Sequence, residues 1–154
     1  MRTLFLKVWL ALLLAGSAGH PAAAQAPAEP PFTLECRSGA RVGGDKQQFC
    51  EVRDLAMPVP VGQPLLIHGA TSSTTVRGWD GPDVRIKVLI QSGGRTQEEA
   101  RTRVQAVAVT AAGNTLRAVL PDLDVERLVR YEVFVPRQTA LVVSATTGNL
   151  RFEN

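Results

Sequence analysis

The sequence predicts a mainly β fold, either a β-solenoid or a β-sandwich-like stack, with one short helix in an excursion between strands. Apolar and polar residues alternate along residues 84–91 and again along residues 129–135. This period of two is typical of strands that bury one face. The apolar runs are short, and turn-forming Gly, Pro, Asn and Asp residues separate them. Only residues 96–106 carry helix signals instead.

The N-terminal segment, residues 1–24, has the pattern of a secretory signal peptide. Arg2 and Lys7 precede an apolar run over residues 8–15, and Ala22 and Ala24 supply the small side chains of a cleavage site. The run is shorter than the roughly 20 apolar residues that a spanning helix needs. We therefore expect an exported protein, in the periplasm or at the cell surface, with no transmembrane segment after cleavage.

Cleavage changes the charge of the protein. The chain has 17 basic and 14 acidic residues, and two of the basic residues lie in the signal, so the mature net charge is 15 − 14 = +1. The two signs alternate along the chain without a basic block. This pattern argues against a nucleic-acid partner. About 130 residues remain after cleavage, a length that suits one domain.

Two cysteines, Cys36 and Cys50, lie in the mature chain. An even pair in an exported protein predicts a disulfide. The alternative, thiols for metal or redox chemistry, lacks a C-x-x-C spacing and a nearby histidine. Closing a loop of about 15 residues stabilises a fold by about 3 kcal/mol. Residues 25–49 are then expected to form a flexible leader and the start of the disulfide-closed loop, followed by a β domain over residues 50–154.

The first strands are short and bounded by turns. Residues 51–57, 65–67 and 74–76 are apolar or β-branched stretches that end at Pro or Gly. Asp80-Gly81-Pro82-Asp83 is a strong turn signal, and the alternating strand over residues 84–91 follows it.

The predicted helix begins at a capping box, in which Thr96 and Glu99 each accept a hydrogen bond from a free backbone N–H. Its apolar stripe recurs at helical spacing, at Ala100, Val104 and Val107, and the helix is expected to fade near residue 106. Gly113-Asn114 then predicts a hairpin between residues 107–110 and 116–120.

Three strands are predicted in the last part of the chain, at residues 129–135, 141–145 and 150–152. An internal echo links two regions: LLIHGATSSTTVRG at 65–78 and LVVSATTGNLRF at 141–152. Both contain an apolar triplet, a corner of small or Thr residues and a short strand. Such units suggest stacked coils of a solenoid, although unrelated strands also resemble one another.

Four stretches together resemble a known family. They are CEVR at residues 50–53, VRGWD at 76–80, TQEEA at 96–100, and YEVFVP at 131–136 followed by Leu141 and TGN at 147–149. Their order and spacing, over roughly residues 50–153, are similar to the bacterial "putative adhesin" domains, an exported family of unknown function.

The resemblance implies a β-solenoid or sandwich-like stack at the cell envelope, with no established catalytic residue to carry over. Members continue past the TGN corner with further Thr- and Gly-rich coils, whereas this chain is C-terminally short and reaches Asn154. The last strand, from Leu150 to Glu153, is therefore expected to be an edge that accepts another strand.

Candidate chemical groups are few. His68 is the single histidine of the mature chain, and a lone histidine beside an apolar run is typical of an ordinary strand residue. Asp80 and Asp83 could hold Ca²⁺ or act as an acid/base pair, but turn chemistry explains them more simply. Trp79 either stacks on a ligand or covers the end of the core. We expect no cofactor and no metal.

These observations favour a non-enzymatic scaffold or adhesion/interaction domain whose partner is another envelope protein or a surface glycan. An alternative is a small secreted module that binds carbohydrate or protein through Trp79, Asp80, Asp83 and Tyr131. A second alternative is a hydrolase that uses His68 with the two aspartates.

Overall fold

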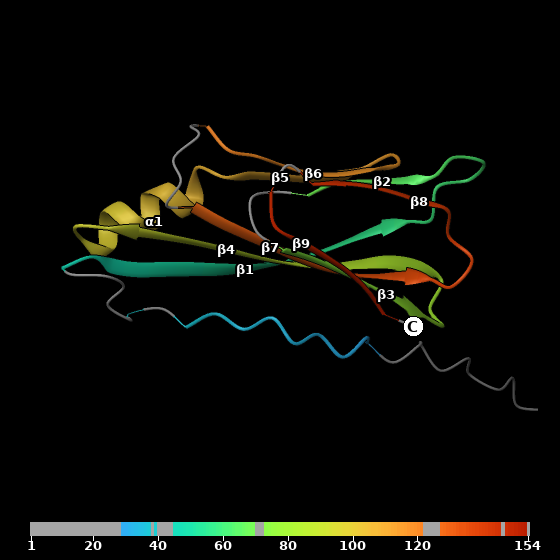
Figure 1. The fold of residues 1–154 in the computed structure, drawn as a ribbon, viewed down its shortest axis with the longest axis horizontal. Coiled ribbons are helices and arrows are strands. Elements are labelled where there is room, and N and C mark those ends of the chain that lie inside the picture. The colour runs from blue at the N-terminus through green and yellow to red at the C-terminus, as the bar shows by residue number, and fades with distance from the viewer. Residues whose placement is uncertain are drawn as a thin grey trace, which may run out of the picture.

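The computed structural model describes residues 29–37, 39, 45–69, 73–121, 127–145 and 147–153. The predicted signal peptide lies outside these residues. Within them the chain forms two mixed β-sheets, of five and four strands, and one short helix. Figure 1 shows the sheets as two layers that face each other without closing into a barrel. The prediction of a mainly β, sandwich-like fold with one helix is confirmed.

The five-stranded sheet contains the longest strands. In spatial order its members are β1 (Gln47–Pro58), β4 (Asp83–Gly94), β7 (Arg127–Pro136), β3 (Ser73–Trp79) and β9 (Asn149–Glu153). The four-stranded sheet contains β5 (Ala108–Ala112), β6 (Thr115–Val119), β2 (Leu65–Gly69) and β8 (Leu141–Ala145). In each sheet the strands on the β1 or β5 side pair antiparallel. Those toward β9 or β8 pair parallel.

The core lies between the two sheets, and the alternating patterns supply it. On β4 the apolar members of the alternation, Val84, Ile86, Val88 and Ile90, are fully buried. Inward residues of β7 meet them, and Leu65, Ile67 and Leu116 contribute from the opposite sheet. Because side chains alternate between the two faces of a strand, the residues between these, such as Arg85 and Lys87 on β4 and Glu132 on β7, lie on the outer face.

The echo in the sequence corresponds to neighbouring strands in both sheets. β2 pairs with β8 from Leu65↔Leu141 onward, and β3 pairs with β9 from Ser73↔Asn149 onward. The offset is the same in both sheets, 141 − 65 = 76 and 149 − 73 = 76. The β2–β3 and β8–β9 units are therefore stacked in parallel, residue on residue. The β6–β7 unit pairs in parallel on the other side of β2–β3.

Helix α1 (Gln97–Gln105) begins at Thr96, as the capping box predicts. The Thr96 hydroxyl accepts a hydrogen bond from the backbone N–H of Glu99 at 3.1 Å. The Glu99 carboxylate accepts from the backbone N–H of Arg95, one residue earlier than the box requires. α1 packs on β1 and β4 through Ala100 and Val104. No helix among the described residues is long and apolar enough to cross a membrane.

Residues 29–37, which we call the strap, lie along the outer face of the five-stranded sheet (Figure 1, lower edge). A disulfide between Cys36 and Cys50, with the two Cα atoms 5.7 Å apart, ties the strap to β1, so the predicted pairing is confirmed. Phe32 of the strap packs edge-on against Phe134 of β7, with ring centroids 5.0 Å apart. Part of the predicted leader thus has defined contacts with the sheet.

Candidate functional site

The predicted ligand surface around Trp79 is engaged in turn contacts. The Trp79 indole Nε1 donates a hydrogen bond to the backbone oxygen of Asp83 at 2.9 Å. The indole ring lies so close to Gly81 that an added Cβ would come within 2.1 Å of it. Asp80 forms an ion pair with Arg137, and Asp83 forms one with Arg85. The ring and both carboxylates therefore hold the turn together.

The hydrolase residues are not brought together. His68 lies on β2 and is exposed, and its Nδ1 is 3.0 Å from the hydroxyl of Ser144 on β8. The two aspartates follow β3 in the other sheet and pair with arginines instead. No group of three His, Cys, Asp or Glu side chains within the described residues could hold a metal ion.

Tyr131 does not belong to an exposed ligand surface, and this part of the prediction is wrong. It is buried between the sheets with the other inward residues of β7. Burial raises the pKa of its hydroxyl, because the charged phenolate is poorly solvated there. Its ring is therefore a core group.

A buried carboxylate, Glu132, holds the strap, and the sequence analysis did not single it out. Glu132 is 1% exposed and lies on the outer face of β7. Its carboxylate accepts hydrogen bonds from the backbone N–H of Thr33 at 2.7 Å and of Leu34 at 3.0 Å, and from the Thr33 hydroxyl at 3.0 Å. It also forms an ion pair with Arg77 of β3. Because these partners compensate the charge, the carboxylate can be buried.

The ion pair continues across the sheet to its edge. The Arg77 Nε donates to Glu153 of β9 at 2.5 Å, and Arg151 of β9 contacts the same carboxylate at 3.0 Å. The hydrogen bond from Arg77 lowers the pKa of the Glu153 carboxyl group, and the charges of both arginines act in the same direction. We call Glu132, Arg77, Glu153 and Arg151 the charge ladder. It runs from a buried acid to an arginine side chain that is 74% exposed.

Where the ladder reaches β9, the core of the sandwich is open to solvent. In the parallel register Val76 of β3 lies between Val133 of β7 and Phe152 of β9. The two valines are buried, but Phe152 is 59% exposed and Leu150 beside it is 40% exposed. On β8, Val142 is 52% exposed, but its neighbours Leu141 and Val143 pack against the core, so Val142 lies on the outer face of that sheet. Phe152 thus has the position of a core residue without a covering strand among the described residues.

We call this region the open end; it consists of the outer edges of β8 and β9 with Val142, Leu150 and Phe152. Within the part of the chain that the structure describes, β9 pairs only with β3, and β8 only with β2. At the opposite end β1 contacts β5, and α1 packs on β1 and β4. An edge that combines free backbone groups with exposed apolar side chains is a site for association.

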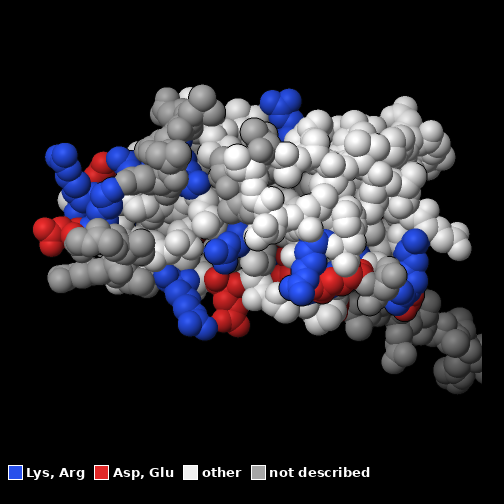
Figure 2. Space-filling model, in the orientation of Figure 1, with Lys and Arg blue, Asp and Glu red and all other residues white. Residues whose placement is uncertain are grey.

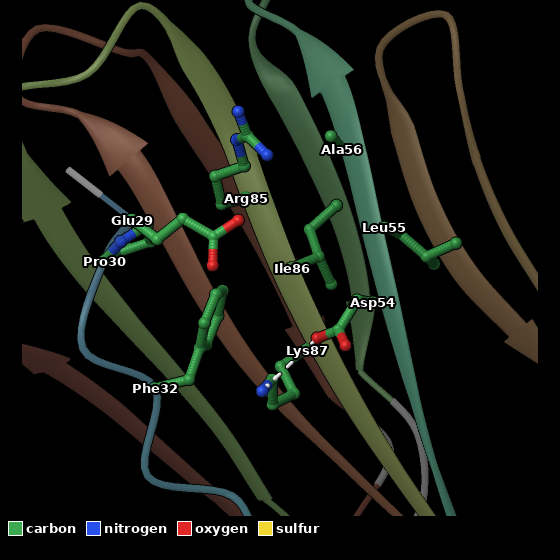
Figure 3. A pocket seen from close by; sticks show the side chains of 9 residues that line it. All are labelled: Glu29, Pro30, Phe32, Asp54, Leu55, Ala56, Arg85, Ile86 and Lys87. Atoms are coloured by element: carbon green, nitrogen blue, oxygen red, sulfur yellow. Dashed lines mark ion pairs between the residues drawn. The ribbon is translucent and has the colours of Figure 1, made fainter. Parts of the chain in front are cut away.

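A shallow cavity of about 240 Å³ lies between the strap and the outer face of β1 and β4 (Figure 3). It is smaller than the roughly 300–1,000 Å³ of most ligand pockets. Three of its charged groups have partners: Lys87 pairs with Asp54 at 3.4 Å and lies 4.9 Å from the Phe32 ring, and Arg85 pairs with Asp83. This cavity is therefore a weaker candidate than the open end.

Charge is distributed unevenly on the face that Figure 2 shows. Lys, Arg, Asp and Glu gather around α1 and over the five-stranded sheet, where the two signs alternate. The part over the four-stranded sheet is mostly uncharged. This face has no large patch of a single sign, among the residues described, of the kind that nucleic-acid binding requires.

Neither a protein-family model nor a curated protein matches this chain. Among solved structures it is similar to a protein of Bacteroides fragilis described as a "putative adhesin", with a TM-score of 0.40 and 16% sequence identity. The similarity covers 69% of this chain and 44% of that protein, so this chain spans less than half of the neighbour's length. Membership of the family that the sequence resembles stays a prediction.

Proposed function

We propose that this protein is a non-enzymatic interaction domain of the cell envelope, which binds a protein partner by strand addition at the open end. The observation that supports this most is the combination, in the described part of the chain, of two free strand edges with exposed apolar residues, of which Leu150 and Phe152 belong to the core pattern. An added strand would take up the free backbone N–H and C=O groups of the edge, while the apolar side chains provide a pocket for its own residues.

The energetics of burial favour such a partner. Fully burying a Leu or Phe side chain is worth about 1.5–3 kcal/mol relative to leaving it exposed. Leu150 and Phe152 are each about half exposed, so covering both would contribute about 1.5–3 kcal/mol together. Backbone hydrogen bonds along β8 and β9 would add to this value.

The contacts of the other candidate residues argue against catalysis and against glycan binding. His68 is separated from Asp80 and Asp83, and each of these aspartates is paired with an arginine. Stacking of a sugar on Trp79 would compete with its contacts to the turn. We therefore prefer a protein partner to a surface glycan.

The disulfide supports the envelope as the place of action. Disulfides persist in oxidising compartments and are rare in the cytosol, and the Cys36–Cys50 bond closes the strap onto β1. Together with the predicted signal peptide, this favours the periplasm or the cell surface.

Site-specific photo-crosslinking in the producing cells tests the proposal. A benzophenone amino acid would replace Val142, Leu150 or Phe152 in three variants, and Val61, which is 96% exposed and lies in the connection between β1 and β2, in a control. We expect protease-sensitive adducts from the three variants and none from the control. Adducts of equal yield at Val61, or none at the open end, would contradict the proposal.

A further inference from the structure

We infer that the occupant of the open end is a second copy of this chain, bound about a two-fold axis that pairs the two β9 strands antiparallel at Phe152. This inference rests on the proposed function, since it names the partner in the strand addition. The inference is based on the order of charged and apolar residues along β9 and on the face of the sheet to which each side chain points.

Two-fold symmetry limits the possible registers of the two strands. In an antiparallel pair related by a two-fold axis, one residue lies opposite its own copy, and its neighbours pair symmetrically about it. A centre at Arg151 would place two arginines opposite each other. A centre at Phe152 places Arg151 opposite the partner's Glu153, and Glu153 opposite the partner's Arg151. Like charges that face each other across a sheet destabilise it, whereas opposite charges stabilise it.

The register centred on Phe152 also closes the core. Phe152 lies in the row of Val76 and Val133, both of which face the interior between the sheets. Residues directly opposite in an antiparallel pair point to the same face. The two Phe152 rings would therefore meet on the inner side, where an aromatic pair covers the exposed end of each core.

On the outer side β9 is complementary to its own copy, because it carries a base, Arg151, and an acid, Glu153, at positions symmetric about Phe152. Within one chain the ladder ends at Arg151, whose side chain is 74% exposed and contacts Glu153 at 3.0 Å. In the dimer each Glu153 carboxylate would also face the partner's Arg151. The ladder would then continue without interruption from the buried Glu132 of one copy to that of the other.

The second strand of the open end fits the same symmetry. The β2–β3 and β8–β9 units are stacked in the same register, so β8 and β9 are edge strands on the same side of the two sheets. A two-fold axis perpendicular to the sheets would turn β8 toward the partner's β8. Val142, 52% exposed on the outer face of β8, would then lie beside the partner's β8. The five-stranded sheet would become continuous across an isologous interface, in which the same surface serves each copy.

A charge exchange tests the register. The mature, oxidised domain and the variants Arg151→Glu and Glu153→Arg would be studied by sedimentation equilibrium. We expect the wild-type protein to have twice the mass of one chain, and each variant alone to dimerise at least about tenfold more weakly, because like charges then face each other twice. An equimolar mixture of the two variants should regain the dimer, since each acid now faces a base. This recovery also shows that both variants are folded.

The remaining outcomes would overturn the inference. A monomeric wild-type protein excludes the second copy, and dimers that survive in both separate variants place the interface elsewhere. A mixture that does not recover the dimer rejects the Phe152-centred register. If the wild-type protein is monomeric but photo-adducts with a different protein form at the open end, the proposed function stands without this partner. If neither photo-adducts nor dimers form, the proposed function and this inference are both rejected.

Discussion

Replacing the buried Glu132 by alanine should release the strap and destabilise the domain by about 3 kcal/mol. Truncating one partner of a buried ion pair costs about 3–5 kcal/mol, because it leaves the other charge without compensation. Here Arg77 keeps its contact with Glu153, and a detached strap can return the N–H groups of Thr33 and Leu34 to water. Both effects place the expected loss at the lower end of that range.

Guanidinium chloride unfolding of the oxidised mature domain measures this loss. Thr33→Val removes only one hydroxyl donor to the same carboxylate, so it should cost about 1 kcal/mol. Glu98→Ala, at an exposed position on α1, should change the stability by less than about 0.5 kcal/mol. Trypsin should cleave after Arg37 faster in the Glu132 variant than in the wild type. A loss below about 1 kcal/mol with unchanged cleavage would refute the assigned role of Glu132.

Three further predictions concern the disulfide, the Trp79 turn and the edge of the sheet. Replacing both cysteines by serine should lower the free energy of unfolding by about 3 kcal/mol, as measured in denaturant, and an unchanged value would show that the tether is dispensable. Gly81→Ala should displace the Trp79 ring and cost about 1–3 kcal/mol, with a shift in indole fluorescence, whereas Gly93→Ala, where nothing lies within 4 Å, should leave the emission unchanged. The neighbouring guanidinium lowers the pKa of Glu153, so the folded state keeps this carboxylate ionised at lower pH than the unfolded chain does. Its stabilisation is therefore complete above the ordinary value of 4.5 and is lost as the pH falls through the lowered pKa. Thermal midpoints should fall more steeply below about pH 4.5 in the wild type than in Glu153→Gln, and parallel profiles would contradict this.

Local patterns predicted the elements because each rests on neighbours in the sequence. The alternation over residues 84–91 became β4, since one face of that strand is buried against the opposite sheet. The Thr96 cap was visible because an N-cap and its N–H donor lie three residues apart. The alternation over residues 129–135 also indicates the correct position of Tyr131. This residue shares its parity with Val129 and Val133 and therefore lies in the core.

The pairing of strands that lie far apart in the sequence was harder to predict. The echo between residues 65–78 and 141–152 suggested that the two regions are related, but only the common register in both sheets shows that they lie side by side. In the sequence, Glu132 is one of the polar residues that alternate with apolar ones over residues 129–135, and nothing local distinguishes it. Its burial depends on the strap and on Arg77, which the chain brings from 99 and 55 residues away. No local pattern contains that information.

The same reasoning explains why the open end was only partly foreseen. The sequence indicated that the strand from Leu150 to Glu153 is an edge, but the inward direction of Phe152 follows from its pairing with Val76. The charge ladder likewise exists only because parallel pairing places Arg77 beside both Glu132 and Glu153.

Self-crosslinking of Phe152→Cys is the most direct measurement of the central claim, that β9 pairs with its own copy at the open end. On the two-fold axis the two Cα atoms would lie about 4.5–5.5 Å apart, which a disulfide can span. Leu150→Cys is the matched control, because its distance from the centre separates the two copies of this position by roughly 14 Å, beyond the reach of a disulfide. Mild oxidation should give a covalent dimer with the Phe152 variant and not with the Leu150 variant. Equal crosslinking of both variants, or none in either, would contradict the account.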